Sequence, residues 1–360
     1  MDNLKQKSKA LLRESLLLTK EVLYSHASPK VLMFPDQGRW SGSSMLWCWE
    51  LASRLRAHSW NTIIVPPSFS LHQRKRVIRT VKPDIILMLK SRHKYNDPEL
   101  YAPIPVVYII DDADYADPKM TDRVASACKT SVCVIAGNRS VRDWCLQFNS
   151  QVHVVWVSHP VPHVWPARKP SERDPVVLWA HASPLGYPHE AALVQDVLIR
   201  AAKEIHFKFH LYGCSGRDEK TRRYCEPLTK AGIEVVLQPY IRRYTNYLKS
   251  LKVGACGLHP VCLENPFSHG KSFGKSLAYL ATDVPVVTSD NPDHSLFFRH
   301  GVNGMTPRNT SQWVEAIVKL IREPTLRDKL AFTARSDFER ELSTERCAAL
   351  VSKLMYNVIG

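Results

Sequence analysis

Two lysines four residues apart, Lys271 and Lys275, lie beside the predicted start of a short helix over residues 273–281. The first N–H groups of a helix have no intrahelical partner, and they attract anions. Gly270 lets the backbone approach a ligand closely, and Ser272 is expected to cap the helix. This arrangement predicts a site for a diphosphate, with the lysines supplying positive charge.

A phosphate-binding loop of the ATPase type is not indicated. That motif follows a strand and reads Gly-x-x-x-x-Gly-Lys-Ser/Thr before its helix. Here the order is loop, helix and then a predicted buried strand over residues 284–287. Glycines and lysines before a helix also occur in ordinary surface turns, so a structural turn is the alternative to a phosphate site.

Residues 270–289 read Gly-Lys-Ser-x-x-Lys-x-Leu-x-Tyr-Leu-Ala-x-x-x-Pro-Val-Val-x-Ser. This segment resembles the nucleotide-sugar segment of the retaining glycosyltransferase family 4, in the subgroup that reads Lys-Ser-x-x-Lys-x-x-Glu-Tyr. Further matches follow in order at residues 300–304 and at Trp313, and an Asp-Asp segment within residues 105–115 is similar to the same subgroup. The resemblance implies the GT-B architecture, in which two Rossmann-like parallel-sheet domains face each other across a cleft.

The sequence departs from the family pattern at several positions. The family carries two glutamates around this loop, but here the second position is Ala278 and the first falls near Gly270. No acidic residue lies between Glu264 and Asp283, and Asp283 itself stands where the family usually has glycine. Loss of these glutamates leaves open a non-catalytic GT-B subunit that binds a sugar nucleotide or a partner.

The family also places an arginine and a lysine after the first strand of the second domain, where this chain has His181 and Ser183. Lys271 and Lys275 would then carry more of the phosphate charge. The candidate residues for donor binding are Gly270, Lys271, Ser272, Lys275, Ser276, His181, Ser183 and Glu264. The candidates for catalysis are Lys275, which would stabilise the leaving diphosphate, together with His269, Asp111 and Asp112.

The acceptor side is predicted from residues that follow strands of the first domain. Asp111 and Asp112 come directly after a predicted strand over residues 105–110, and ligands gather at the carboxyl ends of parallel strands. These carboxylates would orient or deprotonate an acceptor hydroxyl, with a structural turn or a divalent ion site as alternatives. Gly38 lies in a flexible loop, and Trp40 on the same loop could stack on a sugar or a base.

The charge distribution favours anionic partners. The formal net charge is +15, and most of the excess lies in the N-terminal half. The densest basic run is Arg74, Lys75, Arg76 and Arg79, predicted on a helix. It is either a solvated helix face or a contact surface for an anionic acceptor.

Location is predicted from the cysteines and the apolar pattern. The nine cysteines contain no Cys-x-x-Cys, no apolar run approaches a membrane span, and no signal-peptide layout is present. We therefore expect reduced thiols in a cytoplasmic protein. Residues 3–24 form a basic amphipathic pattern that would dock on its own domain or, alternatively, make peripheral contact with the inner membrane surface.

Alternating strands and helices over 360 residues predict an α/β protein of two domains. The expected divisions are an acceptor-side domain over residues 1–160, a proline-rich linker over 161–174 and a nucleotide-sugar domain over 175–360. The final helix, about 344–358, is expected to pack back on the first domain.

The resemblance implies transfer of a sugar from a nucleoside-diphosphate donor, a UDP-sugar in the first place, to a hydroxyl with retention. The donor is a substrate, and neither a tightly bound cofactor nor a metal ion is expected. The acceptor would be a cell-envelope or lipid-linked glycan, or alternatively a hydroxymethylated pyrimidine base in DNA, as in phage-type enzymes. The sequence gives no indication of the oligomeric state.

Overall fold

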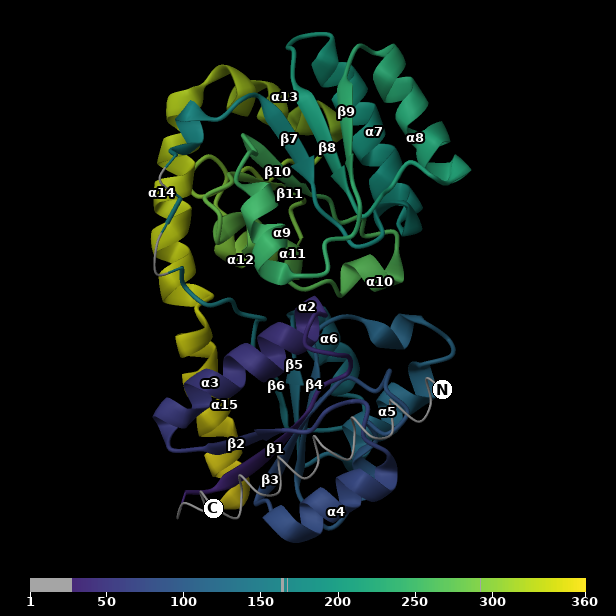
Figure 1. The fold of residues 1–360 in the computed structure, drawn as a ribbon, viewed down its shortest axis with the longest axis vertical. Coiled ribbons are helices and arrows are strands. Elements are labelled where there is room, and N and C mark those ends of the chain that lie inside the picture. Colours follow the sequence, from purple (N-terminus) through teal and green to yellow (C-terminus); the bar gives the residue numbers. More distant parts are fainter. Residues whose placement is uncertain (1–27, 163–164, 167, 292) are drawn as a thin grey trace, which may run out of the picture. The chain divides into compact units, whose positions relative to one another are not determined.

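The computed structural model describes residues 28–162, 165–166, 168–291 and 293–360 (Figure 1). The predicted leading helix of residues 1–24 lies outside the described residues. The chain forms two compact units: unit 1 comprises the residues up to Val157 together with Thr344–Gly360, and unit 2 comprises Ser158–Ser343. Unit 1 is therefore built from two separate stretches of sequence.

Unit 1 contains a six-stranded parallel sheet in the order β2-β1-β3-β4-β5-β6. Its strands are β1 (Lys30–Phe34), β2 (Asn61–Ile64), β3 (Ile85–Leu89), β4 (Val106–Ile110), β5 (Cys133–Ala136) and β6 (Val152–Val154). Most of these residues are buried on both faces, as is usual for parallel sheets covered by helices. The chain runs from β1 to β2 on one side and then returns to β3 on the other, so the strand order reverses between β1 and β3.

Helices cover both faces of this sheet. They are α2 (Gly42–Ser44), α3 (Leu51–Leu55), α4 (Leu71–Val81), α5 (Thr121–Thr130), α6 (Arg139–Cys145) and α15 (Thr344–Ile359), with a π-helical turn at Met45–Glu50. Helix α4 begins at a capping box in which Ser70 and Gln73 satisfy each other's backbone N–H groups. Helix α15 packs on α3, and Trp60 Nε1 donates a hydrogen bond to Ser352 Oγ at 2.9 Å.

Unit 2 contains a five-stranded parallel sheet in the order β11-β10-β7-β8-β9. Its strands are β7 (Val176–Trp179), β8 (Lys208–Tyr212), β9 (Glu234–Gln238), β10 (Cys256–His259) and β11 (Val286–Thr288). In chain order this is the arrangement 3-2-1-4-5 of a Rossmann-like sheet, and its reversal lies between β7 and β10.

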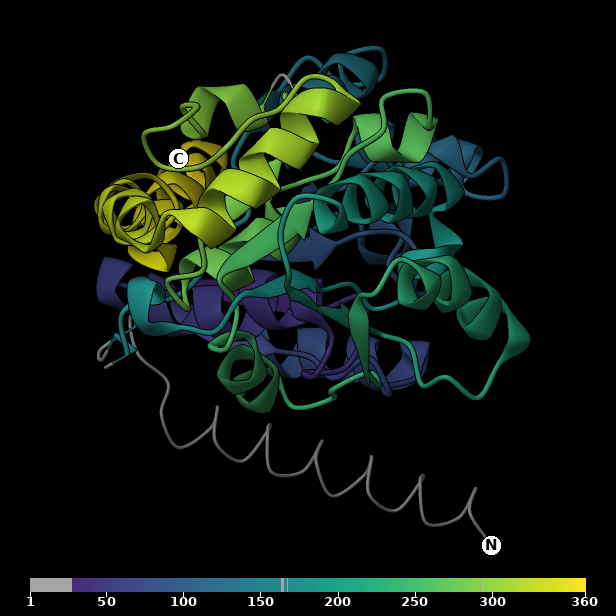
Figure 2. The same ribbon diagram turned by 90° about the horizontal axis from the view of Figure 1, so that it is seen from above.

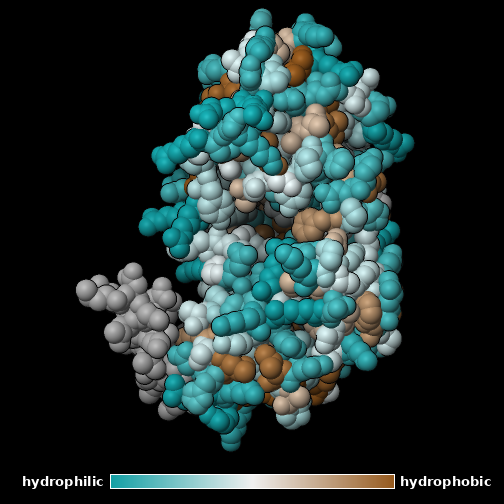
Figure 3. Space-filling model, turned by 90° about the vertical axis from the view of Figure 1, so that its right-hand side faces the viewer, coloured by the Kyte–Doolittle hydropathy of each residue, from teal (hydrophilic) through white to brown (hydrophobic). Residues whose placement is uncertain are grey.

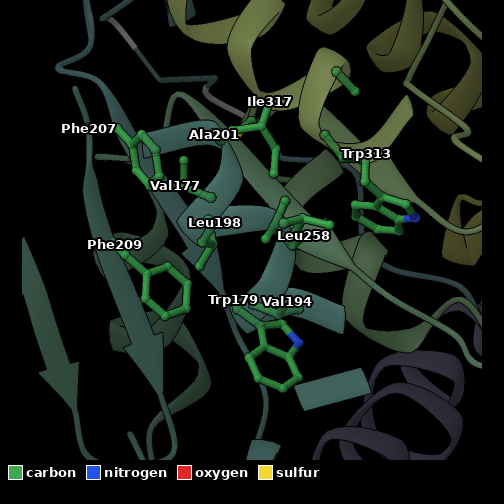
Figure 4. Packing of buried hydrophobic residues seen from close by; sticks show 14 of the residues in the cluster. Val177, Trp179, Val194, Leu198, Ala201, Phe207, Phe209, Leu258, Trp313 and Ile317 are labelled. Carbon is green, nitrogen blue, oxygen red and sulfur yellow. The ribbon is translucent and has the colours of Figure 1, made fainter. Parts of the chain in front are cut away.

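The helices of unit 2 are α7 (Pro188–Ala202), α8 (Glu219–Lys230), α9 (Tyr244–Leu251), α10 (Pro266–His269), α11 (Gly274–Leu280), α12 (His294–Phe297), α13 (Thr310–Arg322) and α14 (Pro324–Glu341). Helices α7 and α13 lie side by side on one face of the sheet (Figure 2). Val177, Leu198, Leu258 and Ile317 meet in the core between these elements (Figure 4). Alternate strand residues point to opposite faces, so Gly257, between two residues of this core, faces α11.

The predicted helix after Gly270 is present as α11, and the predicted strand after it is β11. The predicted cap by Ser272 is wrong, because the residue at the N-cap is Phe273 and it makes no side-chain cap bond. Asp283 has a backbone φ of 55°, in the left-handed region. Glycine adopts this conformation most easily, and here the Asp283 carboxylate is instead held by Arg335.

Within the part of the chain that the structure describes, no helix is long and apolar enough to cross a membrane. On the face shown in Figure 3, hydrophilic side chains predominate and hydrophobic ones form small scattered groups.

Candidate functional site

The candidate site of unit 2 lies at the reversal between β7 and β10. In open parallel sheets, ligands bind outside the carboxyl ends of the strands at such a point. His181 follows β7 by two residues, and His259 is the last residue of β10. Burial lowers the pKa of both imidazoles, and the positive charges of Lys271 and Lys275 lower both further. The two predicted lysines therefore lie close enough to both histidines for their charges to act on each imidazole.

The tautomer of His181 follows from its hydrogen bond. The backbone N–H of Ser183 donates to His181 Nδ1 at 3.0 Å, so Nδ1 is an acceptor. Because the lowered pKa keeps this imidazole neutral near pH 7, its single proton is on Nε2. That atom is buried and has no hydrogen-bond partner within the described residues. His181 thus presents an unsatisfied N–H donor at the carboxyl end of β7, which suits a phosphate oxygen.

Two further imidazoles lie in the same region: His259 acts electrostatically on His181, and His294 packs against His259. Their ring centroids are 4.8 Å apart, and Thr288 Oγ1 lies 3.2 Å from the Nδ1 atom of each. Burial, followed by the charge of Lys271, lowers the pKa of His294 to about 3. The Nε2 atom of His259 is buried and lacks a partner in the described part of the chain. These neutral rings can hydrogen-bond to a ligand without adding charge to the site. No sequence pattern predicted either of them.

Lys271 is a buried lysine whose charge is balanced by a carboxylate. Its side chain is 5% exposed, and Nζ lies 3.9 Å from Glu190 Oε1 and 3.9 Å from the centroid of the Tyr187 ring. Glu190 also accepts a hydrogen bond from Ser268 Oγ. No sequence pattern predicted a role for Glu190; its only local signal is an acidic residue in the first turn of a helix that begins with proline.

Helix α11, which carries Lys275, is fixed to the sheet by Tyr279. The Tyr279 hydroxyl accepts a hydrogen bond from the Ala180 N–H at 2.7 Å, and its ring fills the space above Gly257. A Cβ atom on Gly257 would lie 2.6 Å from that ring, so the glycine is required for this contact. The half-buried Lys275 is one turn before Tyr279 on the same helix and is positioned by this anchor.

The other predicted donor residues have varied environments. Ser276 is buried, and its hydroxyl donates to the Phe273 carbonyl at 2.8 Å, within its own helix turn. Gly270 and Ser272 are also buried. Ser183, Glu264 and His269 are exposed.

In unit 1, the predicted acceptor carboxylates are engaged by a lysine. Asp111 is 1% exposed; its Oδ1 lies 2.6 Å from Lys90 Nζ, and its Oδ2 accepts a hydrogen bond from Trp47 Nε1 at 3.2 Å. Asp112 pairs with the same ammonium group at 2.9 Å. Burial would lower the pKa of Lys90, but Asp111 and Asp112 raise it well above its ordinary value. The lysine is therefore charged, and no sequence pattern had marked it.

The predicted basic surface requires one correction. Arg74 is fully buried, donates to Asn96 Oδ1 at 3.0 Å, and lies over the Phe34 ring at 5.0 Å from its centroid. Placing it on a solvated face was therefore wrong, because its guanidinium is used to join α4 to the loop after β3. On the same helix, Lys75 and Arg79 are exposed and Arg76 is half-buried. Gly38 is exposed, and Trp40 is 44% exposed.

No family model and no curated protein matches the chain. Among solved structures, Anabaena HepE in complex with UDP and glucose is similar, with a TM-score of 0.68, 15% identity, and coverage of 91% of this chain and 100% of that one. S. aureus TarM has a TM-score of 0.60 and 16% identity over 81% of this chain, which spans 59% of the TarM chain. An α-glucosyltransferase in complex with UDP and DNA has a TM-score of 0.63 and 13% identity, with 91% and 100% covered. With its two parallel sheets, the chain therefore has the GT-B fold of these glycosyltransferases.

Proposed function

We propose that the protein is a glycosyltransferase that transfers a sugar from a nucleoside diphosphate, a UDP-sugar in the first place, to an acceptor hydroxyl. The observation that carries this proposal is the site between β7 and β10, where the buried Nε2–H of His181 has no partner in the described residues and shares its environment with Lys271 and Lys275. HepE, which has the same fold, has been solved with UDP-glucose.

In the proposed reaction, the anomeric carbon exchanges its bond to the diphosphate oxygen for a bond to the acceptor oxygen. The electron pair of the broken bond leaves on the diphosphate, and the acceptor hydroxyl releases its proton to an oxygen of the departing diphosphate. Because Glu190 already balances Lys271, Lys275 and the His181 N–H are the groups that would stabilise the developing negative charge. We propose that this charge suffices without a metal ion, and that the reaction retains the anomeric configuration, as the resemblance implies.

UDP is expected to raise the melting temperature of the protein. A ligand that binds only the folded state stabilises it by mass action, about 2.7 kcal/mol at a hundred times its dissociation constant. Differential scanning fluorimetry with UDP measures this shift, and uridine, which lacks the diphosphate, is the matched control and should have a much smaller effect. If UDP, GDP, ADP and TDP at millimolar concentration all leave the melting temperature unchanged, the proposed donor site is wrong.

For the acceptor, we propose a cell-envelope or lipid-linked glycan. DNA carrying a hydroxymethylated base is the second candidate, favoured by the net charge of +15 and by the likeness to an α-glucosyltransferase in complex with DNA. Lys75, Arg76 and Arg79 remain the proposed contacts to an anionic acceptor, whereas Arg74 is used inside unit 1.

Replacing Lys75, Arg76 and Arg79 together with glutamine is expected to weaken binding of duplex DNA if DNA is the acceptor. Each lost phosphate contact should lower the slope of log K against log salt by about one. Fluorescence anisotropy at several salt concentrations measures the slope, and replacing the exposed Lys203, Lys230 and Lys249 of unit 2 together with glutamine is the control, because it also removes three positive charges. Absence of duplex binding by the wild type in low salt would eliminate the DNA candidate.

A further inference from the structure

Unit 1 has its own reversal of strand order, between β1 and β3, and a second polar cluster lies there. Asp36 follows β1 by two residues, and Lys90 directly follows β3. The same topological rule that locates the donor site in unit 2 makes this the expected ligand position in unit 1. Asp36 was not among the residues that the sequence analysis identified.

The Asp36 carboxyl group is buried and incompletely satisfied. Asp36 is 7% exposed, and its Oδ1 has no hydrogen-bond partner among the described residues. Burial raises the pKa of Asp36, and the charges of Lys90 and Arg92 partly offset this effect. Asp111 and Asp114 are close enough to raise it further. A buried oxygen without a hydrogen-bond partner destabilises the fold, so its presence in the native structure calls for an explanation such as a bound ligand.

The neighbouring cations are already paired with other carboxylates. Lys90 Nζ lies 2.6 Å from Asp111 and 2.9 Å from Asp112, and the Arg92 guanidinium binds Asp114 through two hydrogen bonds. Four carboxylates therefore share two cations, and Asp36 is the one without a direct ion pair in the described residues. The local balance is acidic inside a basic protein.

We propose that the Asp36 carboxylate accepts a hydrogen bond from the hydroxyl group of the acceptor, so that the reacting end of the acceptor is an uncharged, hydroxyl-bearing group. A carboxylate can accept but not donate, and a surplus of carboxylates repels a phosphate at the same place. Trp40, four residues further along the chain, is exposed, and its indole is of the kind that stacks on a sugar ring. This inference rests on the proposed glycosyltransferase function and names the class of its acceptor.

The test compares Asp36→Asn with Asp114→Asn as a matched control. If Asp36 is kept for binding, removing its charge should leave the melting temperature equal to or above that of the wild type. Asp114→Asn removes the partner of Arg92 and should lower it. The UDP-induced shift should be the same in Asp36→Asn and wild type, because the donor site is in unit 2.

Turnover is measured as UDP release from UDP-glucose with methyl glucoside or glycerol as acceptor, and with their phosphorylated counterparts. We expect the uncharged acceptors to be preferred, and Asp36→Asn to raise their KM by about tenfold or more, the size of one hydrogen bond to a charged group. A fall in melting temperature equal to that of Asp114→Asn would overturn the inference, and this comparison needs no acceptor. A preference for the phosphorylated acceptors, or an unchanged KM in Asp36→Asn, would also overturn the inference. If the wild type does not bind UDP, the proposed function is overturned instead.

Discussion

Lys275→Ala is expected to reduce turnover of a UDP-sugar by roughly ten- to a thousandfold, the range found when one electrostatic stabiliser of a transition state is removed. Lys271 has a carboxylate 3.9 Å from its ammonium group, so much of its charge is already compensated. Lys275 is half-buried in the first turn of α11, and its charge acts on His181. The loss should therefore appear mainly in kcat, because charge on the diphosphate develops as the glycosidic bond breaks.

The control for Lys275→Ala is Lys249→Ala, which removes an exposed lysine from α9 of the same unit. Both variants should keep the melting temperature of the wild type, and only Lys275→Ala should be slow in a coupled assay of UDP release. Equal turnover of the two variants would place the diphosphate elsewhere. A wild type that binds UDP but never turns over a UDP-sugar would favour the non-catalytic subunit.

Glu190→Ala should lower the free energy of unfolding by about 3–5 kcal/mol, because it leaves a buried lysine without its counter-charge. Glu190 is 1% exposed and accepts hydrogen bonds from Ser268 Oγ and, at 3.5 Å, from the Cys262 N–H. The substitution therefore also leaves buried donors unpaired. Urea unfolding of the full chain, followed by fluorescence, measures the loss.

Two comparisons separate this effect from simple loss of a glutamate. Glu219→Ala removes the acidic partner of an exposed pair with Arg223 on α8 and should change stability little. The double variant Glu190→Ala/Lys271→Met removes both buried charges and should recover much of the loss. A Glu190→Ala protein as stable as Glu219→Ala would show that Lys271 does not depend on this carboxylate.

Much of the fold follows from local sequence patterns. The β-strands are short apolar runs separated by helical periods, and this alternation alone indicates parallel sheets. The helix that carries Lys275 was predicted near its observed bounds, because glycine and polar residues precede an apolar period. The sequence pattern therefore predicted the helices and strands, but not which residues of different elements contact each other.

The remaining features of the site depend on contacts distant in sequence. Glu190 meets Lys271 across 81 positions, and nothing near either residue announces the pair. The sequence neighbours of Arg74 belong to an exposed basic helix face, so its local sequence is typical of a solvated residue. In the fold, Arg74 instead donates a hydrogen bond to Asn96, which is 22 residues away. Only tertiary packing distinguishes a buried cation from a surface one, and sequence periodicity does not contain that information.

Unit 1 is completed by α15, although unit 2 comes between α15 and the rest of it in the chain. As the ribosome synthesises the protein, all of residues 158–343 emerge before residues 344–360 do. Unit 2 can therefore bury its core while Trp60 and the other side chains that pack against α15 are still exposed to solvent. Unit 1 can thus complete its core only after unit 2 has been synthesised, whereas a domain made from a single N-terminal stretch can fold before the rest of the chain emerges.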